Sequence, residues 1–377
     1  MVEVLFFISV FSIFFTYFGY PLTLILVAQL RRKDVLRMEY LPTVTFVVTV
    51  HNEENRIREK LDNILLLDYP REKLQILVAS DGSNDGTNQI ISEYCNRGIE
   101  LIEMLDRRGK ENAQKEVLKN ATGEVIVFSD VATTMETGGL RQLISSFADP
   151  SVGCVSSKDQ VLGRDGKPSG EGLYVRYEMW LRYLESRANS LVGLSGSLFA
   201  ARKEVCQDFS GEMQSDFRTV LNSVKMGLRG ISDPLAIGIY KDIADQKRER
   251  ERKIRTVLRG LTVFFNHLDL LNIFQYGLFS YQLFCHKLLR WLVPFFLILV
   301  FAFNILLIFE SVNYIFLMLL QTLFYSIGIL GLIKRKIETF ILIKIPTYFI
   351  EANMSILFAW WQYLRGKRIV TWSPTIR

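Results

Sequence analysis

The chain has 377 residues, of which 49% are hydrophobic and 22% charged, and its formal net charge is +6. This length is sufficient for a complete catalytic domain together with further segments. The 4 cysteines are scattered and show no CxxC spacing, which argues against both a disulfide framework and a zinc site.

The first predicted element is an apolar helix over residues 4–30, a run without any charged side chain. Such a run gives about 40 Å of helix, more than the ~30 Å hydrocarbon core of a bilayer. It is too long for a signal peptide and no small-x-small cleavage site precedes Arg31, so we expect residues 1–33 to be an uncleaved transmembrane anchor. Arg31, Arg32 and Lys33 indicate, by the positive-inside rule, that the following polar domain is cytoplasmic.

Residues 34–253 alternate between strand and helix patterns. Apolar runs of strand length are followed by stretches with helical spacing, such as Ile57, Leu61 and Ile64. This β-α-β-α-β-α-β order predicts an α/β fold with a parallel sheet covered by helices. The predicted strands are residues 43–50, 74–79, 100–105 and 124–128, and the predicted helices are residues 53–67, 87–94 and 110–119.

Polar clusters directly follow three of the predicted strands. They comprise residues 51–54 (HNEE), 80–87 (SDGSNDGT) and 129–130 (SD). Ligands of parallel sheets bind at the carboxyl ends of the strands. Solvation alone does not require acidic residues directly after each buried strand, so we expect a ligand site at this edge. Within SDGSNDGT, Asp85 and Thr87 are typical of a helix cap.

The carboxyl-terminal part of the chain is apolar again. Residues 254–290 are aromatic and amphipathic, which indicates helices lying at the membrane interface. Residues 291–364 are expected to form membrane helices, with charge-free runs of spanning length at 291–309 and 311–333 and a further apolar stretch at 339–364. Lys344, Pro346 and Glu351 interrupt that last stretch, so it either spans or forms a re-entrant or interfacial helix before a basic tail, residues 365–377.

The ordered set of polar motifs resembles that of the family 2 glycosyltransferases, which are inverting enzymes. The resemblance covers roughly residues 42–260. It implies a GT-A fold, a Rossmann-like nucleotide-sugar-binding domain, here flanked by transmembrane helices as in bacterial members of the family. The motifs that carry it are VVTVHNEE (47–54), SDGSNDGT (80–87), GKENA (109–113), VFSD (127–130), QSDF (214–217) and RKIRT (252–256).

The resemblance implies a nucleotide-sugar donor, most often a UDP-sugar. Carboxylates accept hydrogen bonds from base N–H groups and ribose hydroxyls, and Glu53 and Asp81 are the candidates. Lys110 is expected to meet the diphosphate. Arg252 and Arg255, in a diverged QxxRW motif, either meet the diphosphate or belong to a basic helix on anionic lipid headgroups. Two simpler roles stay open, an acid in a first helical turn for Glu53 and a surface lysine for Lys110.

The leaving diphosphate needs a cation, and the resemblance implies Mg²⁺ or Mn²⁺ bound through oxygen ligands. Asp130, at the end of a buried strand, is the expected metal ligand within the nucleotide-sugar site. Val131 and Ala132 follow it, so the second aspartate of the family's DxD motif is missing. One carboxylate together with phosphate oxygens and waters can still hold Mg²⁺.

Inversion needs a general base for the acceptor hydroxyl and no covalent nucleophile. Asp216 is the expected base, and its alternative role is that of an acid at a helix N-terminus. Ser215 stands where the family has a further acid. Ser195 and Gly196 lie in a segment, LSGS, that either resembles the family's acceptor loop or is a plain turn.

We therefore expect a multi-pass hexosyltransferase of the cell membrane that moves a sugar to a lipid-linked or growing glycan acceptor of the cell envelope at the cytoplasmic face. Its partners are then the donor, the acceptor and membrane lipids, without any nucleic acid. A processive polysaccharide synthase is the nearest alternative, and a non-catalytic membrane scaffold with a degenerate transferase domain is an alternative from another class. A dinucleotide-dependent oxidoreductase is disfavoured because no GxGxxG follows the first strand.

Overall fold

The computed structural model describes residues 1–162, 173–207, 209–241, 246–334 and 340–369. The chain divides into two compact units, which are described separately. One unit, the membrane unit, contains Met1–Thr23, Lys247–Leu261 and Tyr281–Arg368. The other, the sheet unit, contains Leu24–Gln246, Thr262–Ser280 and Ile369. The part of the expected basic tail at residues 370–377 lies outside the described residues.

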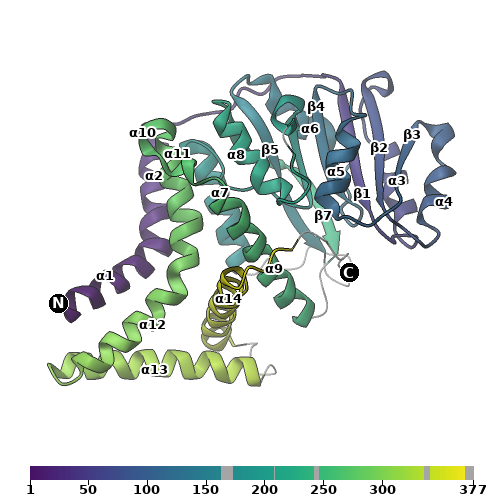
Figure 1. Cartoon of the computed structure of the whole chain (residues 1–377). Helices are drawn as coiled ribbons and strands as arrows, with labels where there is room; N and C mark the ends of the chain where they lie inside the picture. Colours follow the sequence, from purple (N-terminus) through teal and green to yellow (C-terminus); the bar gives the residue numbers. More distant parts are fainter. Residues whose placement is uncertain (163–172, 208, 242–245, 335–339, 370–377) are drawn as a thin grey trace. The chain divides into compact units, whose positions relative to one another are not determined.

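The sheet unit is built on a seven-stranded sheet with the order β3-β2-β1-β4-β6-β5-β7 (Figure 1). The predicted parallel arrangement is confirmed for β3, β2, β1 and β4. β6 runs antiparallel to β4 and β5, which the alternating pattern did not predict, and β5 pairs in parallel with β7. The strands are β1 Val44–Val50, β2 Leu74–Asp81, β3 Ile99–Met104, β4 Val125–Asp130, β5 Val152–Leu162, β6 Leu198–Arg202 and β7 Arg229–Lys241.

Helices cover this sheet, and β1 is buried along its whole length. Phe46, Val48 and Val50 of β1 share one hydrophobic core with apolar residues of α3, α4 and α6, while α5 packs against β1 and β2. Each fully buried side chain of this size stabilises the fold by roughly 1.5–3 kcal/mol. The helices are α3 Ile57–Leu65, α4 Thr87–Ser92, α5 Lys110–Leu118, α6 Gly139–Ser145, α7 Leu173–Ala188 and α8 Ser215–Lys225.

The helix after β1 starts later than predicted. It was expected from residue 53, but α3 begins at Ile57, and Glu53 lies in the preceding loop. Asn52 adopts a left-handed conformation with φ of 53°, which turns the chain out of the strand. Its side chain then donates to Asn84 Oδ1 at 2.8 Å, and the carbonyl oxygen of Glu53 accepts the N–H of Ile57 at 2.9 Å. Glu53 therefore lies just before the first turn of α3, and its simpler role as an acid at a helix N-terminus stays a prediction.

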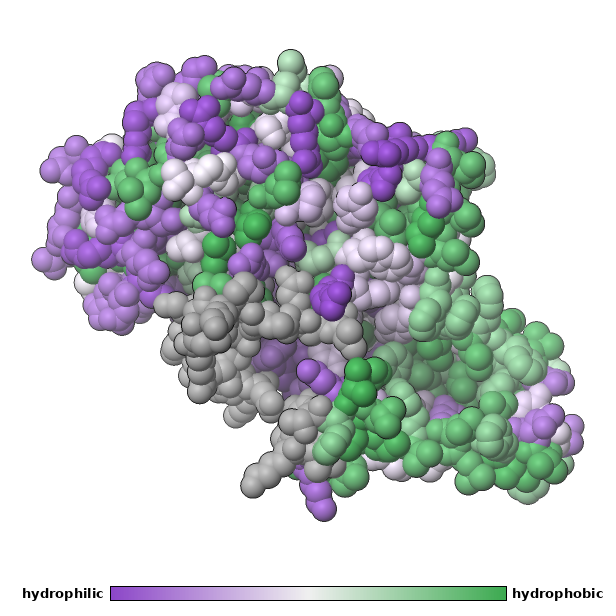
Figure 2. Space-filling view, turned by 180° about the vertical axis from the view of Figure 1, so that it is seen from behind, coloured by the Kyte–Doolittle hydropathy of each residue, from purple (hydrophilic) through white to green (hydrophobic). Residues whose placement is uncertain are grey.

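The described residues contain four helices that are long and apolar enough to cross a bilayer, and most of their residues belong to the membrane unit. These helices identify the chain as a membrane protein. The second candidate span starts at Leu278, earlier than the expected residue 291. Hydrophobic residues gather on the surface of the membrane helices, as expected where lipid replaces water (Figure 2). The helices are α1 Val2–Phe14, α2 Tyr20–Leu30, α11 Leu278–Leu283, α12 Arg290–Leu307, α13 Val312–Ile333 and α14 Ile341–Leu364, with π-helical turns at Phe15–Gly19 and Phe284–Leu289.

The last apolar stretch forms one continuous helix, α14, with Pro346 inside it. Gly328 and Gly331 of α13 face this helix, and a Cβ on Gly328 would lie 2.9 Å from the carbonyl oxygen of Pro346. Small residues of this kind let two membrane helices pack closely. The helix is therefore continuous at Pro346, where the sequence suggested an interruption.

Before the second span, residues 246–276 form α9 Gln246–Phe265, a 3₁₀ turn Leu268–Leu271 and the short α10 Ile273–Tyr276. α9 is a single helix across the boundary expected between residues 253 and 254.

Candidate active site

The three polar clusters that follow β1, β2 and β4 lie at one edge of the sheet, as their positions at parallel strand ends require. The loops after β1 and β2 are hydrogen-bonded to each other. His51 Nδ1 lies 2.7 Å from the carbonyl oxygen of Asp81, and Thr87 Oγ1 accepts the N–H of Glu53 at 2.8 Å. These contacts fix the two loops as one structure.

Asp81 lies at the carboxyl end of β2 and is only 1% exposed. Its two carboxylate oxygens accept the backbone N–H groups of Arg108 and Gly109, both at 2.8 Å. The next residue, Gly82, has φ of 62°, and a Cβ there would lie 2.7 Å from Arg107 N. Asp81 therefore holds the loop that leads directly into α5 and Lys110.

Glu53 is also buried, and its carboxylate receives two hydrogen bonds from the guanidinium of Arg56, both at 2.8 Å. Burial raises the pKa of Glu53, as do the nearby carboxylates of Asp130 and Asp85, while Arg56 lowers it. The carboxyl group is thus a buried acceptor at the same edge as Asp130.

Within SDGSNDGT, Gly86 stands at the N-cap of α4 without a side-chain cap hydrogen bond, and the predicted contact of Asp85 with Thr87 comes from the residue before it. Asp85 Oδ1 accepts the N–H of Thr87 at 3.0 Å and the Thr87 hydroxyl at 2.5 Å. Burial opposes the charge of Asp85, but the hydrogen bonds from Thr87 and from the N–H of Glu54 outweigh it and lower the pKa. Asp85 therefore stabilises the start of α4 and the loop that contains Glu54.

Lys110, Asp130 and Gly196 meet at the centre of this edge. Lys110 Nζ lies 2.5 Å from Asp130 Oδ1 and donates to the carbonyl oxygen of Gly196 at 2.9 Å. The N–H of Asp130 donates to the carbonyl oxygen of Ser197 at 2.9 Å. The segment 195–197 therefore contacts both the Lys110 ammonium and the backbone N–H of Asp130.

Asp216 lies in the first turn of α8 and reaches the same segment from the other side. A Cβ on Gly196 would lie 2.8 Å from Asp216 Oδ2. The Asp216 carboxylate accepts the N–H of Phe217 at 2.8 Å and the side-chain amide of Gln214 at 3.0 Å. Gly196 therefore joins Asp216 to the Lys110–Asp130 pair, although the two aspartates are far apart in the sequence.

Ser195 is buried and faces into the protein. Its hydroxyl donates to Asp159 Oδ1 at 2.7 Å, and Ser197 donates to the same oxygen at 2.9 Å. Its N–H donates to Ser156 Oγ at 2.7 Å. Asp159, on β5, was not predicted from the sequence, and it fixes the segment that carries Gly196.

Lys60 is the second residue that the sequence interpretation missed. It is 1% exposed, and its ammonium donates to Ser129 Oγ at 2.7 Å and to the carbonyl oxygen of Thr133 at 2.5 Å. These two acceptors flank Asp130 in the chain, so Lys60 fixes the segment that carries Asp130. The signal was present in the sequence, because Lys60 lies between Ile57 and Leu61 on the apolar face of α3.

Arg252 and Arg255 lie on α9 within the membrane unit, whereas the carboxylates of the candidate site belong to the sheet unit. Between them, Lys253 lies 4.0 Å from Glu351 of α14 and over the ring of Tyr348 at 4.6 Å. This part of α9 therefore packs against a membrane helix.

Asp130 is the residue best suited to a divalent cation. The described residues contain no group of three or more His, Cys, Asp or Glu side chains arranged to hold a metal. The Asp130 side chain is 23% exposed, and only its Oδ1 accepts the Lys110 ammonium within the described chain. One accessible carboxylate oxygen fits a cation whose other ligands come from phosphates and water.

The sequence matches the profile of the family described as "Glycosyl transferase family 2" over residues 45–209. It is 26% identical over 220 residues to the poly-beta-1,6-N-acetyl-D-glucosamine synthase of Staphylococcus aureus (strain MSSA476), which covers 55% of this chain and 52% of that protein. The synthase of the same name from Staphylococcus epidermidis is 29% identical over 129 residues, 32% of this chain and 31% of that protein. The chain thus spans about half the length, or less, of these curated relatives.

A solved structure is similar over nearly the full chain. The mannosyltransferase PcManGT from Pyrobaculum calidifontis, in complex with GDP-Man and Mn²⁺, superposes with a TM-score of 0.74 and covers 98% of this chain and 100% of its own. The two sequences are 23% identical, so this similarity concerns the fold. It confirms the expected GT-A fold with flanking apolar helices.

Proposed function

We propose that this chain, which belongs to glycosyl transferase family 2, transfers a sugar from a nucleotide-sugar donor to a lipid-linked or growing glycan acceptor at the cytoplasmic face of a membrane. The donor we favour is a UDP-sugar. The observation that carries the proposal is the convergence of Lys110, Asp130 and Asp216 around Gly196 at the carboxyl edge of the sheet.

Asp216 is the general base in this proposal. The acceptor O–H bond breaks and its proton moves to a carboxylate oxygen, while the acceptor oxygen forms the new bond to the anomeric carbon. The bond from that carbon to the diphosphate breaks in line, which inverts the configuration. The hydrogen bonds from Phe217 and Gln214 hold the base in place for this single displacement.

The leaving diphosphate carries the negative charge that develops. Lys110 is placed to donate to it once the donor has displaced part of the ion pair with Asp130. Asp130 would hold Mg²⁺ or Mn²⁺, which neutralises diphosphate charge when bound. Asp81 positions Lys110 through the N–H groups of Arg108 and Gly109. The remaining lone pairs of Asp81 and those of Glu53 are the acceptors that the proposal assigns to the nucleotide part of the donor.

A processive polysaccharide synthase remains the second candidate for the same site. The names of the staphylococcal relatives favour it, since each is a synthase of a polymer. The chemistry of a single transfer is the same in both candidates. They differ only in whether the product stays bound as the next acceptor.

The test uses the full-length protein in detergent with a panel of UDP- and GDP-sugars and membrane lipid extract. We expect release of nucleoside diphosphate with Mn²⁺ or Mg²⁺ and none after chelation. Asp216→Asn should bind donor like the wild type but lose at least about 100-fold in turnover. Asp62→Asn, on the half-exposed outer face of α3, is the matched control and should retain activity. Undiminished transfer by Asp216→Asn would remove the proposed base, and failure to bind any nucleotide sugar would favour the scaffold alternative.

A further inference from the structure

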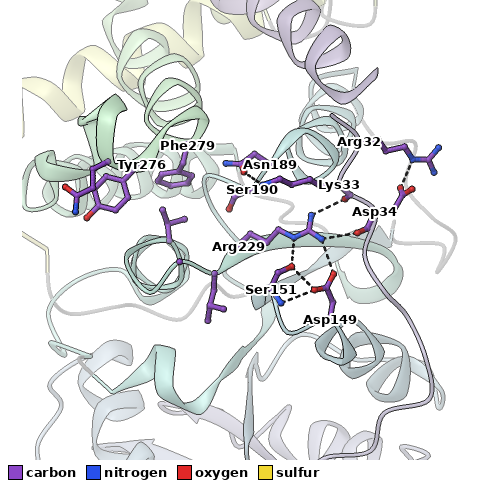
Figure 3. Close-up of a pocket in the computed structure, with 14 residues that line it drawn as sticks. Arg32, Lys33, Asp34, Asp149, Ser151, Asn189, Ser190, Arg229, Tyr276 and Phe279 are labelled. Carbon is purple, nitrogen blue, oxygen red and sulfur yellow. Dashed lines mark hydrogen bonds and ion pairs between the residues drawn. The ribbon is translucent and has the colours of Figure 1, made fainter. Parts of the chain in front are cut away.

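A cavity lies in the sheet unit, at the edge of the sheet opposite the carboxylates. It measures about 510 Å³ and is bounded by the amino-terminal ends of β5 and β7, the chain that follows α2, and α10 (Figure 3). β5 and β7 run in the same direction as β4, so their first residues lie far from the ends that carry the candidate active site. The proposed transferase function uses no residue of this cavity.

Most charges in the cavity wall are paired. Arg229 donates to Asp149 Oδ2 at 3.2 Å and to the carbonyl oxygens of Lys33 and Asp34 at 3.0 and 3.1 Å. Arg32 pairs with Asp34 at 2.6 Å. The guanidinium groups and the two carboxylates therefore neutralise each other, as the dashed lines in Figure 3 show.

Lys33 is the exception in this wall. Its ammonium donates to the neutral Asn189 Oδ1 at 2.9 Å, and it has no carboxylate partner within the described part of the chain. Burial lowers the pKa of Lys33, and the positive charges of Arg229 and Arg31 lower it further. An ammonium at the mouth of a cavity, close to other cations, is stabilised by an anion in that cavity.

The same region exposes large apolar side chains. Arg31 and Lys33 follow immediately after the apolar helix that ends at Leu30. α10, which supplies Tyr276 to the cavity wall, leaves the preceding Phe274 99% exposed. Basic residues next to the end of a membrane-spanning helix, beside exposed aromatic side chains, are typical of the boundary between lipid and water.

We propose that this cavity binds the phosphate of an anionic phospholipid headgroup, with the Lys33 ammonium as its principal hydrogen-bond donor. The cavity has room for a glycerophosphate group, and Arg31 adds attraction for the anion from outside. Phe274 then enters the outer part of the bilayer next to the acyl chains. The ligand is a lipid and not a free phosphate, because only a lipid uses the exposed apolar surface of α10.

The test titrates full-length protein in neutral detergent with short-chain phosphatidylglycerol or phosphatidylcholine and counts bound lipid by native mass spectrometry. We expect phosphatidylglycerol to bind the wild type about tenfold more tightly than phosphatidylcholine. Lys33→Gln should lose about tenfold in affinity for phosphatidylglycerol. Lys119→Gln removes the same charge from an exposed lysine paired with Glu116, and it should bind like the wild type.

Phe274→Ser provides a second variant, which folds because the side chain makes almost no contact with the protein. It should weaken lipid binding and leave the response to soluble glycerol phosphate unchanged. Equal losses in Lys33→Gln and Lys119→Gln would overturn the site, since only overall charge would then matter. Competition by glycerol phosphate as strong as that by the lipid would overturn the assignment to a membrane ligand.

Discussion

The contact between Gly196 and Asp216 makes the candidate active site sensitive to one methyl group. A Cβ at residue 196 would lie 2.8 Å from Asp216 Oδ2, whereas ordinary contacts begin at 3.4 Å. The carboxylate of a Gly196→Ala variant must therefore move by about 0.6 Å, the difference between these distances. The backbone of Gly196 is outside the left-handed region, so the contact is the only source of strain.

Displacing a catalytic group by ~1 Å costs about 100-fold in rate, so we expect Gly196→Ala to lower kcat by roughly 10- to 100-fold. The buried carboxylate is held by Gln214 and Phe217 and has little freedom to recover its position. KM for the donor should stay within about twofold, because uniform binding of the donor is not touched. The assay measures release of nucleoside diphosphate over a range of donor concentrations.

Gly138→Ala is the matched control. A Cβ at Gly138, which precedes α6, meets nothing within 4 Å, and this variant should keep the wild-type kcat. If Gly196→Ala turns over like the wild type, the carboxylate next to Gly196 is not the group that takes the proton. An equal loss in both variants would point to a general effect on stability.

Two further predictions concern buried groups of the sheet unit. Asp81→Ala leaves the N–H groups of Arg108 and Gly109 without acceptors and should destabilise the protein by roughly 2–4 kcal/mol; an unchanged thermal midpoint would contradict this. Burial lowers the pKa of Lys60 from 10.5 to about 7, with a smaller opposing contribution from Asp130. Between these values the unfolded chain holds a proton that the folded chain lacks, so stability should rise with pH, by at most about 5 kcal/mol. Thermal unfolding between pH 7 and 10 should show this rise in the wild type and not in Lys60→Met.

The sequence predicted the parallel half of the sheet well because its strands are continuous apolar runs with polar residues at their ends. The polar residues at these strand ends also predicted where the carboxylates cluster. β6 was not predicted, since its direction depends on pairing with β4 and β5 and not on any local pattern. The late start of α3 depends on the left-handed Asn52 and its contact with Asn84, which spacing cannot show.

Within the site, the role of Gly196 as a junction could not be predicted. It depends on the approach of Lys110 from α5 and of Asp216 from α8 to the same glycine. Asp159 holds that segment from β5, and no motif marks it. Lys60 was predictable in principle, because a lysine on the apolar face of a short helix must be buried or must distort the helix packing.

The ion pair between Lys110 and Asp130 has a consequence for the order in which ligands arrive. The Lys110 ammonium contacts one oxygen of Asp130, the carboxylate proposed to hold a cation. A free divalent ion must compete with the Lys110 ammonium for this carboxylate, so the net free energy of metal binding is small. A diphosphate changes the balance, because it offers the ammonium a second anion and brings oxygen ligands of its own. Under the proposed function, Lys110 is thus the counter-ion of Asp130, and metal and donor bind as a pair.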